Sequence, residues 1–345
     1  MTLKRTLAPL AISMGDPSGI GPEVILKAAA HLARKRPSPA IVVIGDLGAM
    51  AAAAERLGDV PKPYTWKADA RTKPLSHGLP VLNPSRLSAA AIRPGRPSLE
   101  GAKAAYDYIV TSAKMALAGE ASGLVTAPIN KEWLNRAGFH FAGHSELLAK
   151  LSRTRLWRMM FAGDQLKLVL VTVHVGLARV SRMLTRDRVF ETIRLIDQHL
   201  RAEMGIAKPR LAVLGFNPHA GENGLFGDEE IRAIEPAIAK AGRLGIDAHG
   251  PLPPDTAFIR HNDVFAFDAA VAMYHDQGLI ALKTLEFDRA VNITLGLPLV
   301  RTSPDHGTAY DIAGTGKANA DSMTAAIEYA WRAAQRRQQR ALRAA

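Results

Sequence analysis

Short apolar stretches alternate along this chain with longer amphipathic ones. The short stretches are rich in β-branched residues and nearly continuous in apolar character, which is typical of strands that are covered on both faces. We therefore predict strands at Leu7–Met14, Ala40–Ile44, Gly123–Ala127, Leu166–His174, Leu211–Phe216 and Ala269–Tyr274, with a further short strand near Leu79–Leu82.

The amphipathic stretches repeat their apolar residues at helical spacing. One lies in residues 98–118, and its apolar face consists of Tyr106, Ile109, Val110, Ala113 and Leu117. A second lies in residues 186–202, with Val189, Ile193, Ile196 and Leu200 on one face. Strands and helices in alternation predict an α/β fold with a mainly parallel sheet.

Composition limits the class of protein. A chain of 345 residues that is 48% hydrophobic is long enough for about two domains. No uncharged apolar stretch reaches the roughly 18 residues of a membrane span, so we expect no membrane association.

The N-terminal apolar run is interrupted at Gly15-Asp16-Pro17, which indicates a first strand rather than a signal peptide. The chain has no Cys, which excludes disulfides and thiolate chemistry and fits a cytoplasmic location.

The formal net charge is +12, which favours anionic partners. Part of this charge lies near the C-terminus, at Arg332, Arg336, Arg337, Arg340 and Arg343. A solvated face of a last helix explains these arginines. Nucleic-acid binding is the alternative, but no basic segment is interleaved with aromatic residues, so we expect no nucleic-acid partner.

Polar clusters follow several of the predicted strands, where open α/β sheets place their functional residues. The first strand is followed by GDPSGIGPE (15–23), which allows either a tight turn or an anion cradle at a helix N-terminus. His174, His219 and His275 each end or follow a different strand. One such histidine is usually structural, but three can converge on a metal site with open positions for substrate. Asp276 could orient an imidazole or act on substrate.

Two further groups are candidates for substrate binding. Lys283, Asn292 and Arg301 are suited to a phosphate dianion, although three unrelated surface residues would give the same pattern. His144 and Ser145 open a predicted helix, where capping by Ser145 is the simpler interpretation.

Taken together, these clusters resemble the 4-hydroxythreonine-4-phosphate dehydrogenase family of pyridoxal phosphate biosynthesis. The similar segments are GDPSGIGPE (15–23), TAPINKE (126–132), GHSELL (143–148), NPHAGENGLFGDEE (217–230), GPLPPDT (250–256), AMYHDQG (272–278), VNITLGLP (291–298) and RTSPDHGTAYDIAGTGKA (301–318). The last segment is also similar to the cofactor loop of isocitrate and isopropylmalate dehydrogenases.

The resemblance implies a two-domain α/β/α fold like that of isocitrate and isopropylmalate dehydrogenases. Residues 1–138 plus 312–345 would form the first domain. Residues 139–311 would form the second, with the metal ligands and the dimer interface. The active site would lie in the interdomain cleft of a homodimer and be shared between its subunits.

The resemblance also implies roles for individual residues. His174, His219 and His275 would bind a divalent metal (Zn, Co, Mn or Mg), and Asp255 and Asp276 would be catalytic. The substrate would contact His144, Ser145, Lys283, Asn292 and Arg301, with Ser145 in place of the family's Thr. The cofactor, NAD or NADP, would contact His306, Gly307, Thr308 and Asp311.

The implied reaction is NAD(P)-linked oxidation of the C3 hydroxyl of 4-phosphohydroxy-L-threonine, followed by decarboxylation to 3-amino-2-oxopropyl phosphate. Related enzymes that oxidise 4-phospho-D-threonate or 4-phospho-D-erythronate are an alternative, because the sequence leaves the substituent at C2 open. Asn292 and Arg301 argue against a terephthalate cis-dihydrodiol, which has no phosphate. The predicted cofactor loop argues against a metal-dependent phosphate-ester hydrolase.

Overall fold

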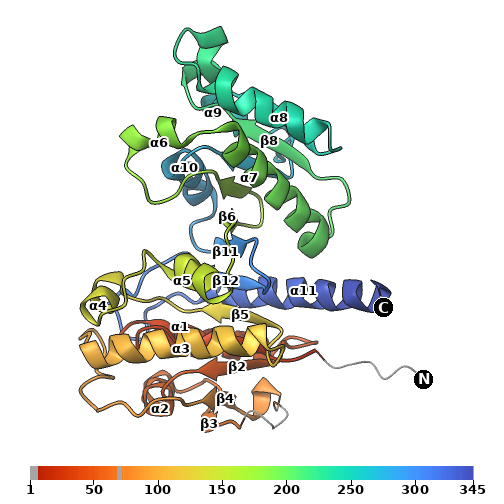
Figure 1. The fold of residues 1–345 in the computed structure, drawn as a ribbon. Helices are drawn as coiled ribbons and strands as arrows, with labels where there is room; N and C mark the ends of the chain where they lie inside the picture. Colours follow the sequence, from red (N-terminus) through yellow and green to blue (C-terminus); the bar gives the residue numbers. More distant parts are fainter. Residues whose placement is uncertain (1–6, 68–71, 73, 345) are drawn as a thin grey trace. The chain divides into compact units, whose positions relative to one another are not determined.

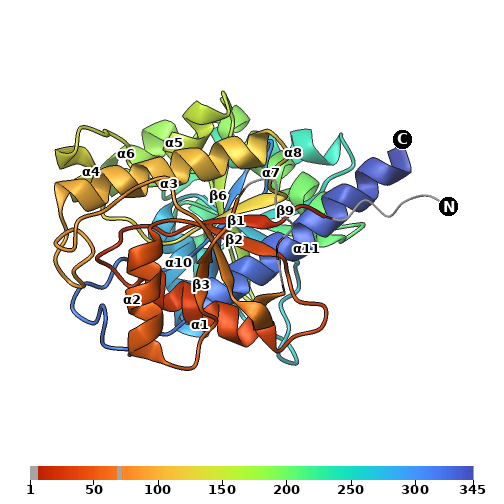
Figure 2. The ribbon, with the colours of Figure 1, turned by 90° about the horizontal axis from the view of Figure 1, so that it is seen from below.

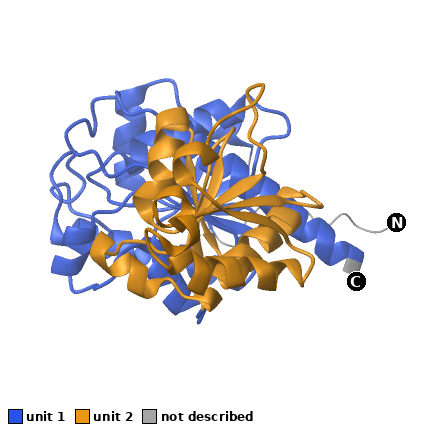
Figure 3. Ribbon diagram, turned by 90° about the horizontal axis from the view of Figure 1, so that it is seen from above, with its two compact units in different colours: residues 1–155, 297–345 blue, residues 156–296 orange. Residues whose placement is uncertain are grey.

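The computed structural model describes residues 7–67, 72 and 74–344. The chain divides into two compact units, unit 1 with Met1–Arg155 and Leu297–Ala345, and unit 2 with Leu156–Gly296 (Figures 1 and 3). Residues 139–155 and 297–311, which the sequence prediction placed in the second domain, therefore belong to unit 1. The reason is that α5 (His144–Leu151) packs on α3 (Leu99–Leu117) and β12 (Arg301–Pro304) pairs with β5 (Gly123–Thr126).

Unit 1 contains a parallel sheet with the strand order β3-β4-β2-β1-β5-β12. Its other strands are β1 (Leu10–Ser13), β2 (Ile41–Ile44), β3 (Pro63–Thr65) and β4 (Leu79–Leu82). Every residue of β1, β2 and β5 is buried, which explains their continuous apolar sequence.

Helices cover both faces of this sheet. The remaining helices of unit 1 are α1 (Gly21–Ala33), α2 (Leu47–Leu57), the short η1 (Leu75–His77), α4 (Lys131–Arg136) and α11 (Asp321–Ala344). Figure 2 shows α3 on one side of β1 and β2, with α1 and α11 on the other. The predicted helix in residues 98–118 is confirmed as α3, which Ser98 caps by accepting a hydrogen bond from the Gly101 amide.

Unit 2 contains a mixed sheet with the strand order β11-β6-β7-β10-β8-β9. Its strands are β6 (Arg158–Ala162), β7 (Lys167–Leu170), β8 (Arg210–Leu214), β9 (Asp247–Leu252), β10 (Ala269–Ala272) and β11 (Val291–Leu295). Strands β7, β10, β8 and β9 are parallel, whereas β6 runs antiparallel to both β7 and β11. The carboxyl ends of the four parallel strands therefore lie along one edge of the sheet.

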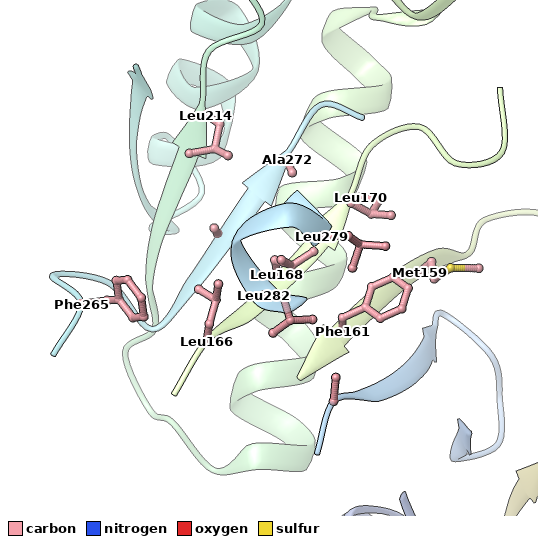
Figure 4. Packing of buried hydrophobic residues seen from close by; sticks show 12 residues of the cluster. Met159, Phe161, Leu166, Leu168, Leu170, Leu214, Phe265, Ala272, Leu279 and Leu282 are labelled. Carbon is pink, nitrogen blue, oxygen red and sulfur yellow. The ribbon is translucent and has the colours of Figure 1, made fainter. Parts of the chain in front are cut away.

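The core of unit 2 lies between this sheet and α10 (His275–Glu286) (Figure 4). Leu279 and Leu282 of α10 pack against Phe161 of β6 and Leu168 of β7. The remaining helices are α6 (Leu177–Met183), α7 (Arg186–His199), η2 (Leu200–Met204), η3 (Pro218–Gly224), η4 (Glu230–Ile234), α8 (Glu235–Gly242) and α9 (Pro254–Ala257). Within the described part of the chain, no helix is both long and apolar enough to span a membrane.

Candidate active site

The strand order brings the three predicted metal ligands to one edge of the unit 2 sheet. Strands β7, β10 and β8 are neighbours and run parallel. His174, His275 and His219 follow the carboxyl ends of these three strands in that order. The carboxyl ends of these three strands therefore lie side by side at one edge of the sheet, as expected. This edge is where α/β sheets usually bind ligands.

His174 and His275 line the same pocket, which has a volume of about 260 Å³. The centroids of their rings lie 6.1 Å apart. Nδ1 of His275 lies 2.6 Å from Oδ1 of Asp276, so this carboxylate orients the ring and leaves Nε2 for a ligand. Two imidazoles in one pocket, one of them held by a carboxylate, match the donor chemistry of a transition-metal site.

His219 lies on η3, and its ring contacts Phe226 at a centroid distance of 6.0 Å. Among the residues that the structure describes, no three histidine or carboxylate side chains are grouped closely enough to hold one metal ion. The structure thus brings together two of the three candidate ligands and positions the third on a neighbouring loop. The three-histidine site stays a prediction.

The backbone at these histidines is unusual. His174 has a φ of 50°, and residues 219–223 all have positive φ, with His219 at φ 50° and ψ 31°. Each non-glycine residue in this left-handed region costs roughly 1–2 kcal/mol. Such strain persists only where the surroundings impose it, and it is concentrated at functional sites.

Side chains that the sequence analysis did not assign connect these loops. Gln277 accepts a hydrogen bond from the Met273 amide at 2.6 Å and donates one to the Gly215 carbonyl at 2.7 Å. It therefore joins the end of β10 to the end of β8. Glu230 binds the backbone that precedes His219. Both residues lie in motifs quoted above, but only the folded chain shows what they contact.

Unit 1 carries the other predicted substrate residues. Arg301 is only 3% exposed and donates a hydrogen bond from Nη2 to Oγ1 of Thr126 at 2.8 Å. Burial lowers the pKa of Arg301 to about 10, against the opposing effect of Glu146, so it stays cationic at neutral pH. His144 and the buried Ser145 begin α5. Nε2 of His144 is buried and has no hydrogen-bond partner among the described residues, which fits a site that a ligand completes.

The other predicted residues lie in unit 2. Lys283, on α10, is exposed, and its Nζ lies 5.7 Å from the centroid of the Phe287 ring. Asn292 lies on β11, opposite Phe161 of β6. Asp255 lies in α9 with an exposed side chain.

The predicted cofactor loop is joined to the first strand's turn. The Tyr310 hydroxyl donates to Oδ2 of Asp16 at 2.6 Å, and the Ile20 amide donates to the Thr308 carbonyl at 3.0 Å. Burial raises the pKa of Asp16, against the opposing hydrogen bonds from Tyr310 and Ser18. A Cβ at Gly19 would lie 3.0 Å from the Thr308 carbonyl, so glycine permits this close approach. Two motifs at opposite ends of the sequence thus form one structure.

The loop also carries a buried ring nitrogen. Nε2 of His306 is buried without a hydrogen-bond partner in the described residues, and Nδ1 lies 3.2 Å from the Gly307 carbonyl. Gly307 has open space where a Cβ would project, and Asp311 is exposed. An unsatisfied ring nitrogen beside open backbone fits the binding of a polar cofactor.

The buried histidines predict a loss of stability in acid. Burial, together with Arg301 and Lys131, lowers the pKa of His144 well below its usual value, and burial lowers that of His306. Below about pH 6.5 the unfolded chain binds protons at these positions and the native chain does not. The free energy of unfolding therefore decreases as the pH is lowered. Urea titrations at about pH 7 and pH 5 should show that the free energy of unfolding decreases less between these two pH values for His144→Asn than for the parent protein. An equal loss in both proteins would contradict this assignment.

Known proteins with similar sequences belong to one enzyme family. A family model described as "Pyridoxal phosphate biosynthetic protein PdxA" matches residues 37–330. The chain is 47% identical over 331 residues to a 4-hydroxythreonine-4-phosphate dehydrogenase of Maricaulis maris, covering 94% of this chain and 97% of that relative.

Solved structures agree with this similarity. The 4-hydroxythreonine-4-phosphate dehydrogenase of Klebsiella pneumoniae superimposes with a TM-score of 0.83 at 41% identity, covering 95% of this chain and 100% of that one. A terephthalate 1,2-cis-dihydrodiol dehydrogenase of Burkholderia xenovorans gives a TM-score of 0.66 at 28% identity, covering 94% and 98% of the two chains. These comparisons confirm the α/β fold class and the predicted family resemblance.

Proposed function

Because the chain belongs to the pyridoxal phosphate biosynthetic protein PdxA family, we propose that it oxidises 4-phosphohydroxy-L-threonine at C3 with NAD or NADP. The oxidised acid then loses CO₂ to give 3-amino-2-oxopropyl phosphate. The observation that carries this proposal is the 47% identity, over nearly the full length of both chains, to a relative named for this activity. The chain is accordingly an oxidoreductase that acts on a CH–OH group.

In this proposal the substrate's anionic groups are bound by His144, Ser145, Arg301, Lys283 and Asn292. The buried guanidinium of Arg301 supports this role, because it is a cation at neutral pH and donates a hydrogen bond to Thr126. A guanidinium presents two parallel N–H groups to an oxyanion, which gives orientation as well as binding energy. Neutral His144 donates or accepts a hydrogen bond through its buried Nε2.

His174, His219 and His275 hold a divalent metal (Zn, Co, Mn or Mg) in this proposal. Such an ion would lower the pKa of the substrate hydroxyl. Asp276 orients His275, which its 2.6 Å contact with Nδ1 supports. The C3 hydroxyl proton passes to a carboxylate, for which Asp255 and Asp276 are the candidates. During decarboxylation the bond between C2 and the carboxyl carbon breaks, and C2 then takes up a proton.

The cofactor is held by His306, Gly307, Thr308 and Asp311. NAD or NADP would accept the hydride. The hydrogen bonds from Tyr310 to Asp16 and from Ile20 to Thr308 support this role, because they restrain the loop through contacts within the chain.

We further propose a cytoplasmic homodimer whose subunits share the active site, without a nucleic-acid or membrane partner. Several large apolar side chains of unit 2 support an interface, because they are strongly exposed near the candidate site. They are Leu177 (63%), Leu225 (72%), Phe226 (46%) and Ile231 (49%).

Steady-state kinetics test the proposed substrate. With saturating NAD or NADP, kcat/KM for 4-phosphohydroxy-L-threonine should exceed that for 4-phospho-D-threonate and 4-phospho-D-erythronate by about tenfold or more, because the site would hydrogen-bond the C2 amine. Cofactor absorbance and release of CO₂ are the two readouts. Higher kcat/KM for either hydroxy acid would replace the proposed substrate, and no turnover of any of the three would reject the dehydrogenase assignment.

A further inference from the structure

The left-handed segment that carries His219 closes around the side chain of Glu230. Glu230 is 2% exposed, although it is a carboxylate at the start of η4. A Cβ added to Gly221 would lie 2.7 Å from its Oε2, and one added to Gly215 would lie 3.3 Å from its Oε1. The two glycines therefore leave the space that this carboxylate occupies.

Glu230 binds the backbone directly before the left-handed segment. Its Oε1 accepts hydrogen bonds from the amides of Phe216 at 2.6 Å and Asn217 at 2.8 Å. Its Oε2 accepts a third hydrogen bond, from Nδ2 of Asn217 at 2.8 Å. One buried anion thus fixes two consecutive peptide groups and a side chain, all within three residues of His219. Hydrogen bonds to a charged acceptor are the stronger kind, which suits a strained segment.

A second carboxylate extends this arrangement. Nδ2 of Asn217 also donates to Oε2 of Glu229 at 2.8 Å, and Glu229 accepts a hydrogen bond from the hydroxyl of Ser181 on α6. The segment before His219 is therefore tied to η4 and, through Glu229, to α6, which contributes to the pocket of His174 and His275.

We propose that Glu230 is a positioning residue that holds His219 in the backbone conformation needed to bind a metal. This inference rests on the proposed function, in which His219 is a metal ligand. Residues 219–223 do not adopt positive φ by preference, since only Gly221 among them lacks a Cβ. Glu230 restrains the backbone at Phe216 and Asn217, directly before the residues with positive φ. Residues that hydrogen-bond a metal ligand directly typically change metal affinity by about 10- to 100-fold when they are replaced. We expect an effect of this order for Glu230, because it holds the backbone that carries the ligand.

The test uses the full-length protein and measures the affinity for Co²⁺ from its visible absorption bands. Glu230→Gln keeps the size of the side chain but removes its charge. It also replaces one acceptor oxygen with an NH2 group, which faces either the two backbone amides or Nδ2 of Asn217. We expect Co²⁺ affinity to fall about 10- to 100-fold with altered absorption bands. Hydrogen exchange of the metal-free protein should also accelerate in residues 216–224. Asn217→Ala should show a smaller loss of affinity, because it leaves the two backbone hydrogen bonds in place.

Glu286→Gln is the matched control. Glu286 also accepts hydrogen bonds from backbone amides of one turn, namely Asp164, Gln165 at 2.8 Å and Leu166 at 2.7 Å. This variant should lose stability but keep Co²⁺ affinity within about twofold of the parent. The turn precedes β7, whereas His174 follows it, and Glu286 is at the opposite end of α10 from His275. An equal loss of affinity in both variants would reduce the role of Glu230 to general stability and overturn the inference.

His219→Ala separates failure of this inference from failure of the proposed function. If His219→Ala weakens Co²⁺ binding and Glu230→Gln does not, Glu230 is not a positioning residue, and the metal site stands. If His219→Ala binds Co²⁺ like the parent protein, His219 is not a ligand, and the inference falls together with the three-histidine site.

Discussion

Replacing His219 with alanine is expected to lower kcat by about a thousandfold or more, with loss of bound metal. A metal that stabilises negative charge on an oxygen contributes several kcal/mol to the transition state, and each 1.4 kcal/mol corresponds to about a tenfold rate difference. His219 is exposed, and alanine, like histidine, has a Cβ at this positive φ, so the free energy of unfolding of the metal-free protein should change by only about 0.5 kcal/mol. The measurements are kcat with saturating substrate, metal content after dialysis, and a urea titration.

His249→Ala is the control for this experiment. His249 is also an exposed histidine of unit 2, with 70% of its side chain accessible, and it lies on β9 outside the candidate site. It should retain the parent kcat and metal content. Full activity of His219→Ala after chelation and dialysis would remove His219 from the metal site.

Replacing Arg301 is expected to lower kcat/KM for the phosphorylated substrate by about 10- to 100-fold. A charge-assisted hydrogen bond contributes roughly 1.5–3 kcal/mol net, which corresponds to this range. Arg301→Met is the better variant for this test, because Arg301 is 3% exposed and alanine would leave a cavity. The kcat/KM of Arg301→Lys should lie between those of the parent protein and Arg301→Met, because a lysine keeps the charge but cannot form the bidentate contact.

Thr126→Val separates the guanidinium from the contact that holds it. The valine removes the oxygen that accepts the hydrogen bond of Nη2, yet leaves the cation in place. It should lower kcat/KM less than Arg301→Met does. The parent protein should prefer the phosphorylated substrate. If Arg301→Met is folded, turns over phosphorylated and dephosphorylated substrate equally, and is the only variant that loses this preference completely, Arg301 contributes to binding as predicted. An unchanged preference for the phosphorylated substrate would contradict the assignment.

Local sequence determined much of the fold. Continuous apolar runs predicted β1, β2, β5 and β10 close to their observed bounds, because each is buried on both faces and needs no particular partner to be recognised. The strand near Leu79–Leu82 is confirmed as β4. The positions of His174, His219 and His275 after separate strands were also evident, and the parallel order of β7, β10 and β8 is what places them at one edge.

Long-range contacts determined the rest. The sequence of β12 is RTSP, yet all four of its residues are buried, since Arg301 bonds Thr126 and the Thr302 hydroxyl donates to the Ala326 carbonyl. No local pattern reveals such a strand, because its polar groups are satisfied by residues distant in sequence. The same holds for the hydrogen bond between Tyr310 and Asp16. The sequence by itself therefore determined the apolar strands and the kinds of side chain at their ends. Only the tertiary structure decided which of them meet, because hydrogen bonds between distant segments leave no periodic trace in the sequence.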